Sequence, residues 1–122
     1  MNEKKAYAVA NQYCKNEGAR LFEPKSETAN KAVYDKAVEV FGGNPEIKTW
    51  IGINDIATEG KWVFESSGIE VSSAFWHKRN QFIDEQDCVM FGYWSDNGEN
   101  WLDRKCDEKN YFICEYGEYK YF

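Results

Sequence analysis

The amino-acid sequence predicts an α+β domain in which two helices come first and short strands follow. Two observations predict this order. Apolar residues recur at helical spacing as far as Phe41, and from Thr49 onward they gather in short runs separated by turn residues. The length of 122 residues is that of one domain, and the 43% of hydrophobic residues suffices for a core. We therefore expect residues 1–122 to form a single domain.

Each predicted helix has an apolar stripe and a stop signal. The first stripe, which Gly18 ends, consists of Ala6, Val9, Ala10, Tyr13 and Cys14. Ser26 is a good N-cap for the second helix, and Glu27 suits the positive end of its dipole. Its apolar face, which ends before the glycine pair 42–43, consists of Ala29, Val33, Ala37, Val40 and Phe41.

The second half of the chain predicts strands and one long loop. Short apolar or aromatic runs at 50–53, 61–64, 88–91 and 111–116 indicate strands. Residues 65–87 are rich in polar side chains and indicate a loop, and Asp96-Asn97-Gly98 is a strong turn signal.

Charge excludes several classes of function. Lys and Arg total 15 against 21 Asp and Glu, which gives a net charge of -6 and argues against binding nucleic acid through its phosphates. The same balance argues against a basic membrane-surface helix. No run approaches the roughly 20 apolar residues that span a bilayer, so membrane insertion is not expected. No signal peptide is apparent, which suggests a mature, trimmed or engineered chain.

The four cysteines predict two disulfides. Cys14, Cys88, Cys106 and Cys114 show no C-x-x-C spacing, and His77 is the sole histidine, so a zinc site is not expected. Two disulfides place the protein in an extracellular or secreted setting. Spacing alone leaves all three possible pairings open.

Several short motifs, taken together and in order, resemble the C-type lectin-like domain family. They begin with Tyr7, Ala10, Cys14, Gly18, Ala19 and Leu21. They continue through 50–55 (WIGIND), 60–62 (GKW), Trp76, 87–89 (DCV), 101–103 (WLD), Cys106 and 111–115 (YFICE). The resemblance implies the α+β fold of that family in its short form, with a long loop region. It also implies the pairings Cys14–Cys114 and Cys88–Cys106.

The end of the chain departs from the order of that family. The family begins with an aromatic strand before its first helix, whereas this chain starts almost at the helix and ends with 117–122 (GEYKYF). We predict that 117–122 is the displaced first strand of a circular permutant, natural or engineered. A strand exchanged between two chains and a disordered aromatic tag are the alternatives.

In this family, sugar binding usually runs through a calcium ion in the long loop, and the resemblance locates the corresponding positions here. The ligand triplet reads Asn80-Gln81-Phe82 without its proline, the glutamate is replaced by Gln86, and the Asn-Asp pair reads Leu102-Asp103. One carboxylate and a few amides make a poor calcium cage, so the usual site is expected to be weak or absent and no cofactor is predicted. The eight acids between 84 and 108 are interpreted as a solvated surface, because their spacing matches no metal loop.

The predicted function is non-enzymatic recognition of a glycan. No nucleophile elbow or phosphate-binding loop is present, and His77 has no partner that would make it a catalytic base. The expected ligand-binding residues are Asn80, Gln81, Phe82, Gln86, Trp94, Asn100 and Asp103. The alternatives are calcium-independent binding of an extracellular protein, anchored by Phe82, Ile83 or Trp94, and an engineered permuted scaffold.

Overall fold

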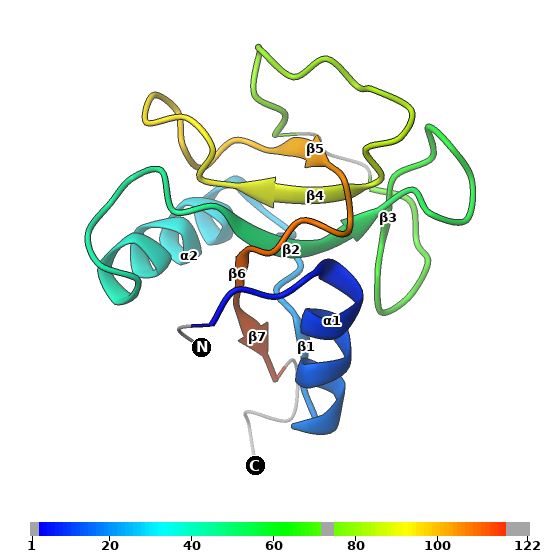
Figure 1. Ribbon diagram of the computed structural model, residues 1–122, viewed down its shortest axis with the longest axis horizontal. Helices are drawn as coiled ribbons and strands as arrows, with labels where there is room; N and C mark the ends of the chain where they lie inside the picture. The colour runs from blue at the N-terminus through cyan, green and yellow to red at the C-terminus, as the bar shows by residue number, and fades with distance from the viewer. Residues whose placement is uncertain (1–2, 72–74, 117–122) are drawn as a thin grey trace.

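The computed structural model describes residues 3–71 and 75–116 (Figure 1). Along the chain the elements are α1 (Tyr7–Asn16), β1 (Arg20–Leu21), α2 (Glu27–Val40), β2 (Thr49–Asn54), β3 (Val63–Phe64), β4 (Cys88–Phe91), β5 (Leu102–Arg104), β6 (Tyr111–Phe112) and β7 (Cys114–Glu115). The α+β class is confirmed, but the predicted order of two helices before all strands is wrong in one respect, because the short strand β1 lies between α1 and α2.

The strands form two sheets. In the larger one the order is β3-β2-β4-β5, and β6 pairs with β2 in parallel. The smaller sheet pairs β1 with β7, near α1 (Figure 1). All six residues of β2 are buried, as expected for the central strand of a sheet covered on both faces.

Both helices form where the sequence predicts them, but one valine of each predicted apolar stripe is exposed. The Ser26 hydroxyl accepts a 3.1 Å bond from the Ala29 amide, which confirms the N-cap of α2. Val9 and Val40 were placed on apolar faces, but they are 53% and 51% exposed. The apolar pattern of each helix is wider than the face it buries, so single exposed valines remain.

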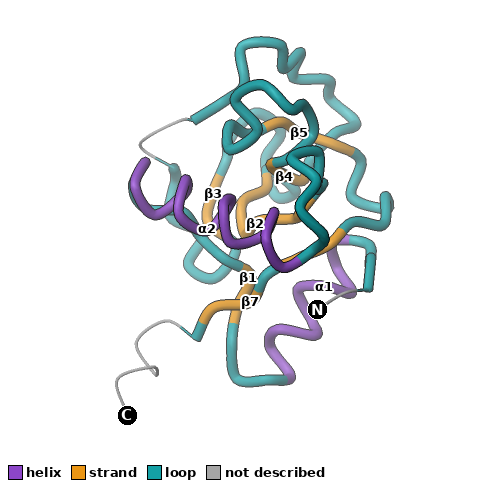
Figure 2. Tube along the Cα trace, turned by 90° about the vertical axis from the view of Figure 1, so that its left-hand side faces the viewer, coloured by secondary structure: helices purple, strands orange, loops and turns teal. Residues whose placement is uncertain are grey.

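The helices cover different parts of the core. α2 lies across the larger sheet (Figure 2), where Tyr34 and Ala37 pack with Ile51, Ile53 and Phe91. α1 packs Tyr7, Ala10 and Cys14 into a second cluster around Trp50.

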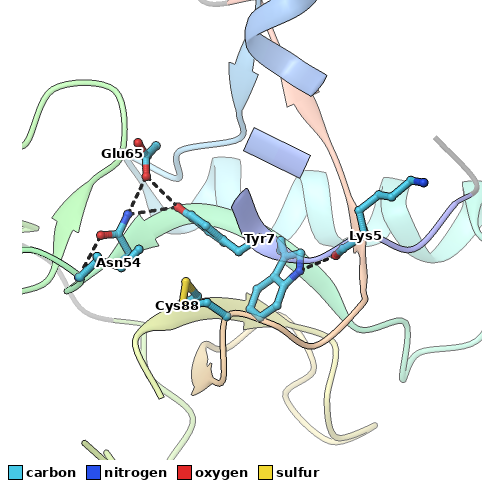
Figure 3. The surroundings of a disulfide bond; sticks show 8 residues. Lys5, Tyr7, Asn54, Glu65 and Cys88 are labelled. Atoms are coloured by element: carbon cyan, nitrogen blue, oxygen red, sulfur yellow. Dashed lines mark hydrogen bonds between the residues drawn. A yellow bond between two sulfur atoms is a disulfide. The ribbon is translucent and has the colours of Figure 1, made fainter. Parts of the chain in front are cut away.

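A buried hydrogen-bonded group joins α1 to β2 beside Cys88 (Figure 3). The Asn54 amide donates to the Tyr7 hydroxyl at 3.2 Å and to the Glu65 carboxylate at 2.8 Å. The Trp50 indole N–H donates to the Lys5 carbonyl at 2.9 Å. Burial raises the pKa of Tyr7, so its hydroxyl stays neutral.

Both disulfide pairings are confirmed. Cys14–Cys114 joins α1 to β7, and Cys88–Cys106 joins β4 to the segment after β5. Residues 117–122 lie outside the described residues, so the displaced strand and the permutation stay predictions. Neither α1 nor α2, the helices of the described ranges, has the length and apolarity that a bilayer crossing requires.

Candidate functional site

Three carboxylates converge where the central strands end. Asp55 follows β2, and Asp87 precedes β4. Antiparallel pairing of these strands brings the two residues together, and the Asp55 amide donates to the Asp87 carbonyl at 3.0 Å. With Glu59 from the following turn, one carboxylate oxygen of each residue lies within 4.8 Å of the others. The name acid cluster is used below for Asp55, Glu59 and Asp87.

Buried oxygens at this cluster have no hydrogen-bond donor among the described residues. With all three acids ionised, one Asp55 oxygen accepts from the Gly60 amide at 2.7 Å, but its other oxygen and one Asp87 oxygen lack a partner. On the adjacent strand β5, Asp103 is 1% exposed and both its carboxylate oxygens are unpartnered. Buried carboxylate oxygens without donors are costly, and a cation is a group that would compensate them.

The acids perturb one another. A hydrogen bond with Asp55 raises the pKa of Glu59 to about 7, and burial and the nearby Asp87 add to the increase. Burial raises the pKa of Asp55 and that of Asp103, with further contributions from neighbouring carboxylates. Hard oxygen donors packed this closely suit calcium, so the residues present fit a divalent cation.

An aromatic group forms where the long loop meets the residue that precedes β3. Phe82 has φ +54°, a backbone region that bulky residues rarely adopt, and its side chain is 48% exposed. Its ring centroid lies 4.8 Å from that of Trp76 and 6.5 Å from that of Trp62. The Trp62 and Trp76 rings are 5.0 Å apart. These three residues are called the aromatic platform below.

Amide side chains flank the platform, and one of them connects it to the acids. The Asn80 side-chain oxygen accepts from the Asp103 backbone amide at 3.1 Å. The side-chain nitrogen of Asn80 has no partner among the described residues. Gln81 is exposed and Gln86 is half-buried. Asn80 therefore ties the long loop to Asp103, and its side-chain nitrogen is buried.

Trp94 belongs to a different group of side chains. Its ring lies 4.4 Å from the ring of His77, and the Arg79 guanidinium lies 5.1 Å above it. Arg79 also makes two 2.8 Å bonds to Asp96. His77 is 3% exposed and contacts the Asp96 carbonyl at 3.0 Å. These contacts hold the long loop against the 92–98 loop. They already cover much of the Trp94 side chain.

The sequence matches the family described as Lectin C-type domain over residues 3–116. This chain belongs to the C-type lectin domain family. Among curated relatives, collectin-11 of Danio rerio is 30% identical over 95% of this chain and 41% of its own length. Human tetranectin is 27% identical over 93% of this chain and 55% of its own length. The chain thus spans about half the length of the relatives it matches first.

Solved structures agree with the fold. The mouse scavenger receptor C-type lectin carbohydrate-recognition domain superposes with a TM-score of 0.76 at 26% identity, over 93% of this chain and 82% of that one. Family membership supports the predicted class, a C-type lectin-like domain.

The predicted ligand-binding residues of this C-type lectin domain separate into groups. Asn80, Gln81 and Phe82 lie together on the long loop, while Asp103 turns inward beside the acids. Asn100 lines a separate cavity next to Trp76. Sequence reasoning missed Asp55 and Glu59, although both flank predicted elements: one ends the WIGIND motif and the other precedes Gly60.

Proposed function

We propose that this domain is a secreted recognition module that binds a glycan on the aromatic platform. The conformation of Phe82 carries the proposal. A bulky residue at φ +54° costs of order 1–3 kcal/mol, and such strain is typical of ligand contacts. The ring that this strain holds in place is half exposed rather than buried, so burial of the ring in the core does not account for it.

The surroundings of Phe82 suit a sugar. An aromatic ring offers an apolar face for the C–H side of a pyranose, and amides supply both donors and acceptors for its hydroxyls. Gln81 is exposed directly beside Phe82, and its amide offers both a donor and an acceptor. A small number of polar groups around an apolar surface is the usual arrangement of a small-molecule site.

Calcium would have a positional role in this proposal. The acid cluster and Asp103 would hold the ion, which neutralises their charge. The Asp103 backbone amide is hydrogen-bonded to Asn80, so an ion that fixes the position of Asp103 would also fix the loop that holds Phe82. Phe82 offers no oxygen ligand and Asp103 faces inward, which argues against a calcium ion shared with the sugar.

The test is calorimetric titration with neutral monosaccharides, chosen from a glycan array, on the wild type and two variants. Phe82→Gly removes the ring and also relieves the φ strain, so the fold should survive while sugar affinity falls by about tenfold or more. Ile69→Ala, at an exposed apolar residue outside the platform, should bind as the wild type does. Equal binding by Phe82→Gly and the wild type would refute the platform.

Binding of an extracellular protein is the second candidate, because Ile83 is 42% exposed directly beside Phe82. Two adjacent exposed apolar side chains can anchor a protein partner. The variant Ile83→Ser separates the two functions. Sugar binding should tolerate it, whereas a protein anchor should lose affinity on replacement of either residue.

A further inference from the structure

Among the described residues, a cavity of about 790 Å³ shares Trp76 alone with the aromatic platform and no residue with the acid cluster. It lies between the start of α2, the turn at 97–100 and the pair Phe75–Trp76. Its volume falls within the roughly 300–1,000 Å³ of small-molecule sites. Neither the acid cluster nor Phe82 lines it.

The walls of this cavity are held by buried contacts. The Asn30 side chain of α2 donates to the Glu99 carbonyl at 2.7 Å and accepts from the Trp101 indole at 3.0 Å. Gly98 packs against Tyr34 so closely that a Cβ at this position would collide with the ring hydroxyl. Helix and turn are thus fixed relative to each other, and the cavity is preformed.

The lining offers the kinds of group that bind sugars. Trp76 supplies an aromatic wall, Asn97 and Asn100 supply amides, and Thr28 supplies a hydroxyl. Asn97 has φ +53°, a conformation that asparagine tolerates and that marks the turn.

The charge of the cavity lining limits which class of sugar the cavity can bind. Of the described residues, three carboxylates line the cavity, from Glu27, Asp35 and Glu99, against one cation, Lys31. Lys31 is already paired with Asp35 at 3.0 Å. An anionic ligand would meet net negative charge, whereas carboxylates accept hydrogen bonds from neutral hydroxyls.

Trp76 belongs to both the platform and the cavity, since its ring packs edge-to-face against Phe82 and also lines the cavity. We propose that the cavity is a second subsite for a neutral oligosaccharide whose first unit lies on the aromatic platform. This inference rests on the proposed function. A neighbouring hollow of about 500 Å³ shares Lys31, Asp35, Asn97 and Glu99 with the cavity, so the path can continue along α2. Sialylated or sulfated chains should be disfavoured.

The experiment measures affinity against chain length with two probe series, manno-oligosaccharides and N-acetylglucosamine oligomers of one to four units. The blocking variant is Ala32→Tyr, since Ala32 is an exposed residue of α2 that lines the cavity. Ala8→Tyr, at an exposed alanine of α1 outside the cavity, is the matched control. Thermal unfolding verifies that both variants fold.

We expect affinity of the wild type and of Ala8→Tyr to rise about tenfold or more between one and three units. In Ala32→Tyr the monosaccharide affinity should be kept and the gain with length lost. A wild type that binds one unit and three units equally, or a gain that survives Ala32→Tyr, would overturn the second subsite and leave the platform standing. Absence of binding to every sugar would instead refute the proposed function, and the second subsite with it.

Discussion

Calcium should stabilise the folded domain through the acid cluster, and replacement of Asp55 by asparagine should abolish the effect. In the folded chain three carboxylates lie within 4.8 Å of one another, and buried oxygens of Asp55 and Asp87 lack donors. A cation bound there favours the folded state, because the unfolded chain does not bring these acids together.

The size of the effect follows from linkage. Extracellular calcium modules bind with dissociation constants of roughly 10⁻⁴–10⁻³ M, so about 10 mM calcium adds roughly 1.4–2.7 kcal/mol. The 122 residues imply an unfolding entropy of about 0.26 kcal/mol/K. The melting temperature should therefore rise by roughly 5–10 °C.

Differential scanning calorimetry in calcium and in EDTA measures this shift. Asp55→Asn should lose the shift and should melt higher than the wild type in EDTA, because one of three mutually repelling charges is gone. Asp84→Asn, at an exposed acid of the same loop region, is the control and should keep the shift. Equal melting temperatures of the wild type in calcium and EDTA would refute the argument. A full shift in Asp55→Asn would place the ion elsewhere.

Three further predictions concern stability. In EDTA the raised pKa of Glu59, about 7 against an ordinary 4.5, means that the folded state holds the proton more tightly. Its contribution is present below pH 4.5 and lost as the pH rises through 7, so melting temperature should fall between these values and Glu59→Gln should flatten the profile. Replacing Cys88 and Cys106 by alanine removes a link across 18 positions, and urea unfolding should show a loss of about 3 kcal/mol. Deleting 118–122 should lower the melting temperature, because an apolar groove of about 310 Å³ lies beside Tyr116, where the described chain ends. An unchanged melting temperature would contradict the displaced strand, and a concentration-dependent one in the full chain would favour the exchanged strand.

The fold was largely predictable because its elements have local signals. Ser26 predicts the start of α2, and the apolar run at 50–53 predicts the central strand. Local patterns do not say which side of a helix is covered, so the exposure of Val9 and Val40 was missed. The disulfide pairing was out of reach of spacing alone and came from resemblance to a family.

The candidate site was less predictable, because its residues meet only through strand pairing. Asp55 and Asp87 are 32 positions apart in the chain and become neighbours when β2 pairs with β4. The acids of 84–108 were expected to form a solvated surface. Asp84 and Glu85 are exposed, but Asp87 is half-buried and Asp103 fully buried. Sequence proximity grouped acids that the fold separates.

The acid cluster and the aromatic platform are held in place by different parts of the fold, so substitutions can change one without the other. Asp55, Asp87 and Asp103 lie on or beside three hydrogen-bonded strands, and the register pairs Cys88 with both Asn54 and Arg104. The disulfide of Cys88 reinforces that register. The residues proposed to face the sugar lie on a loop, joined to the strands by contacts such as the one from Asp103 to Asn80. Substitutions in the loop triplet can therefore remove a sugar-bridging calcium without displacing the strand acids. A cation site can persist for stability in a domain whose ligand is bound by aromatic and amide groups instead.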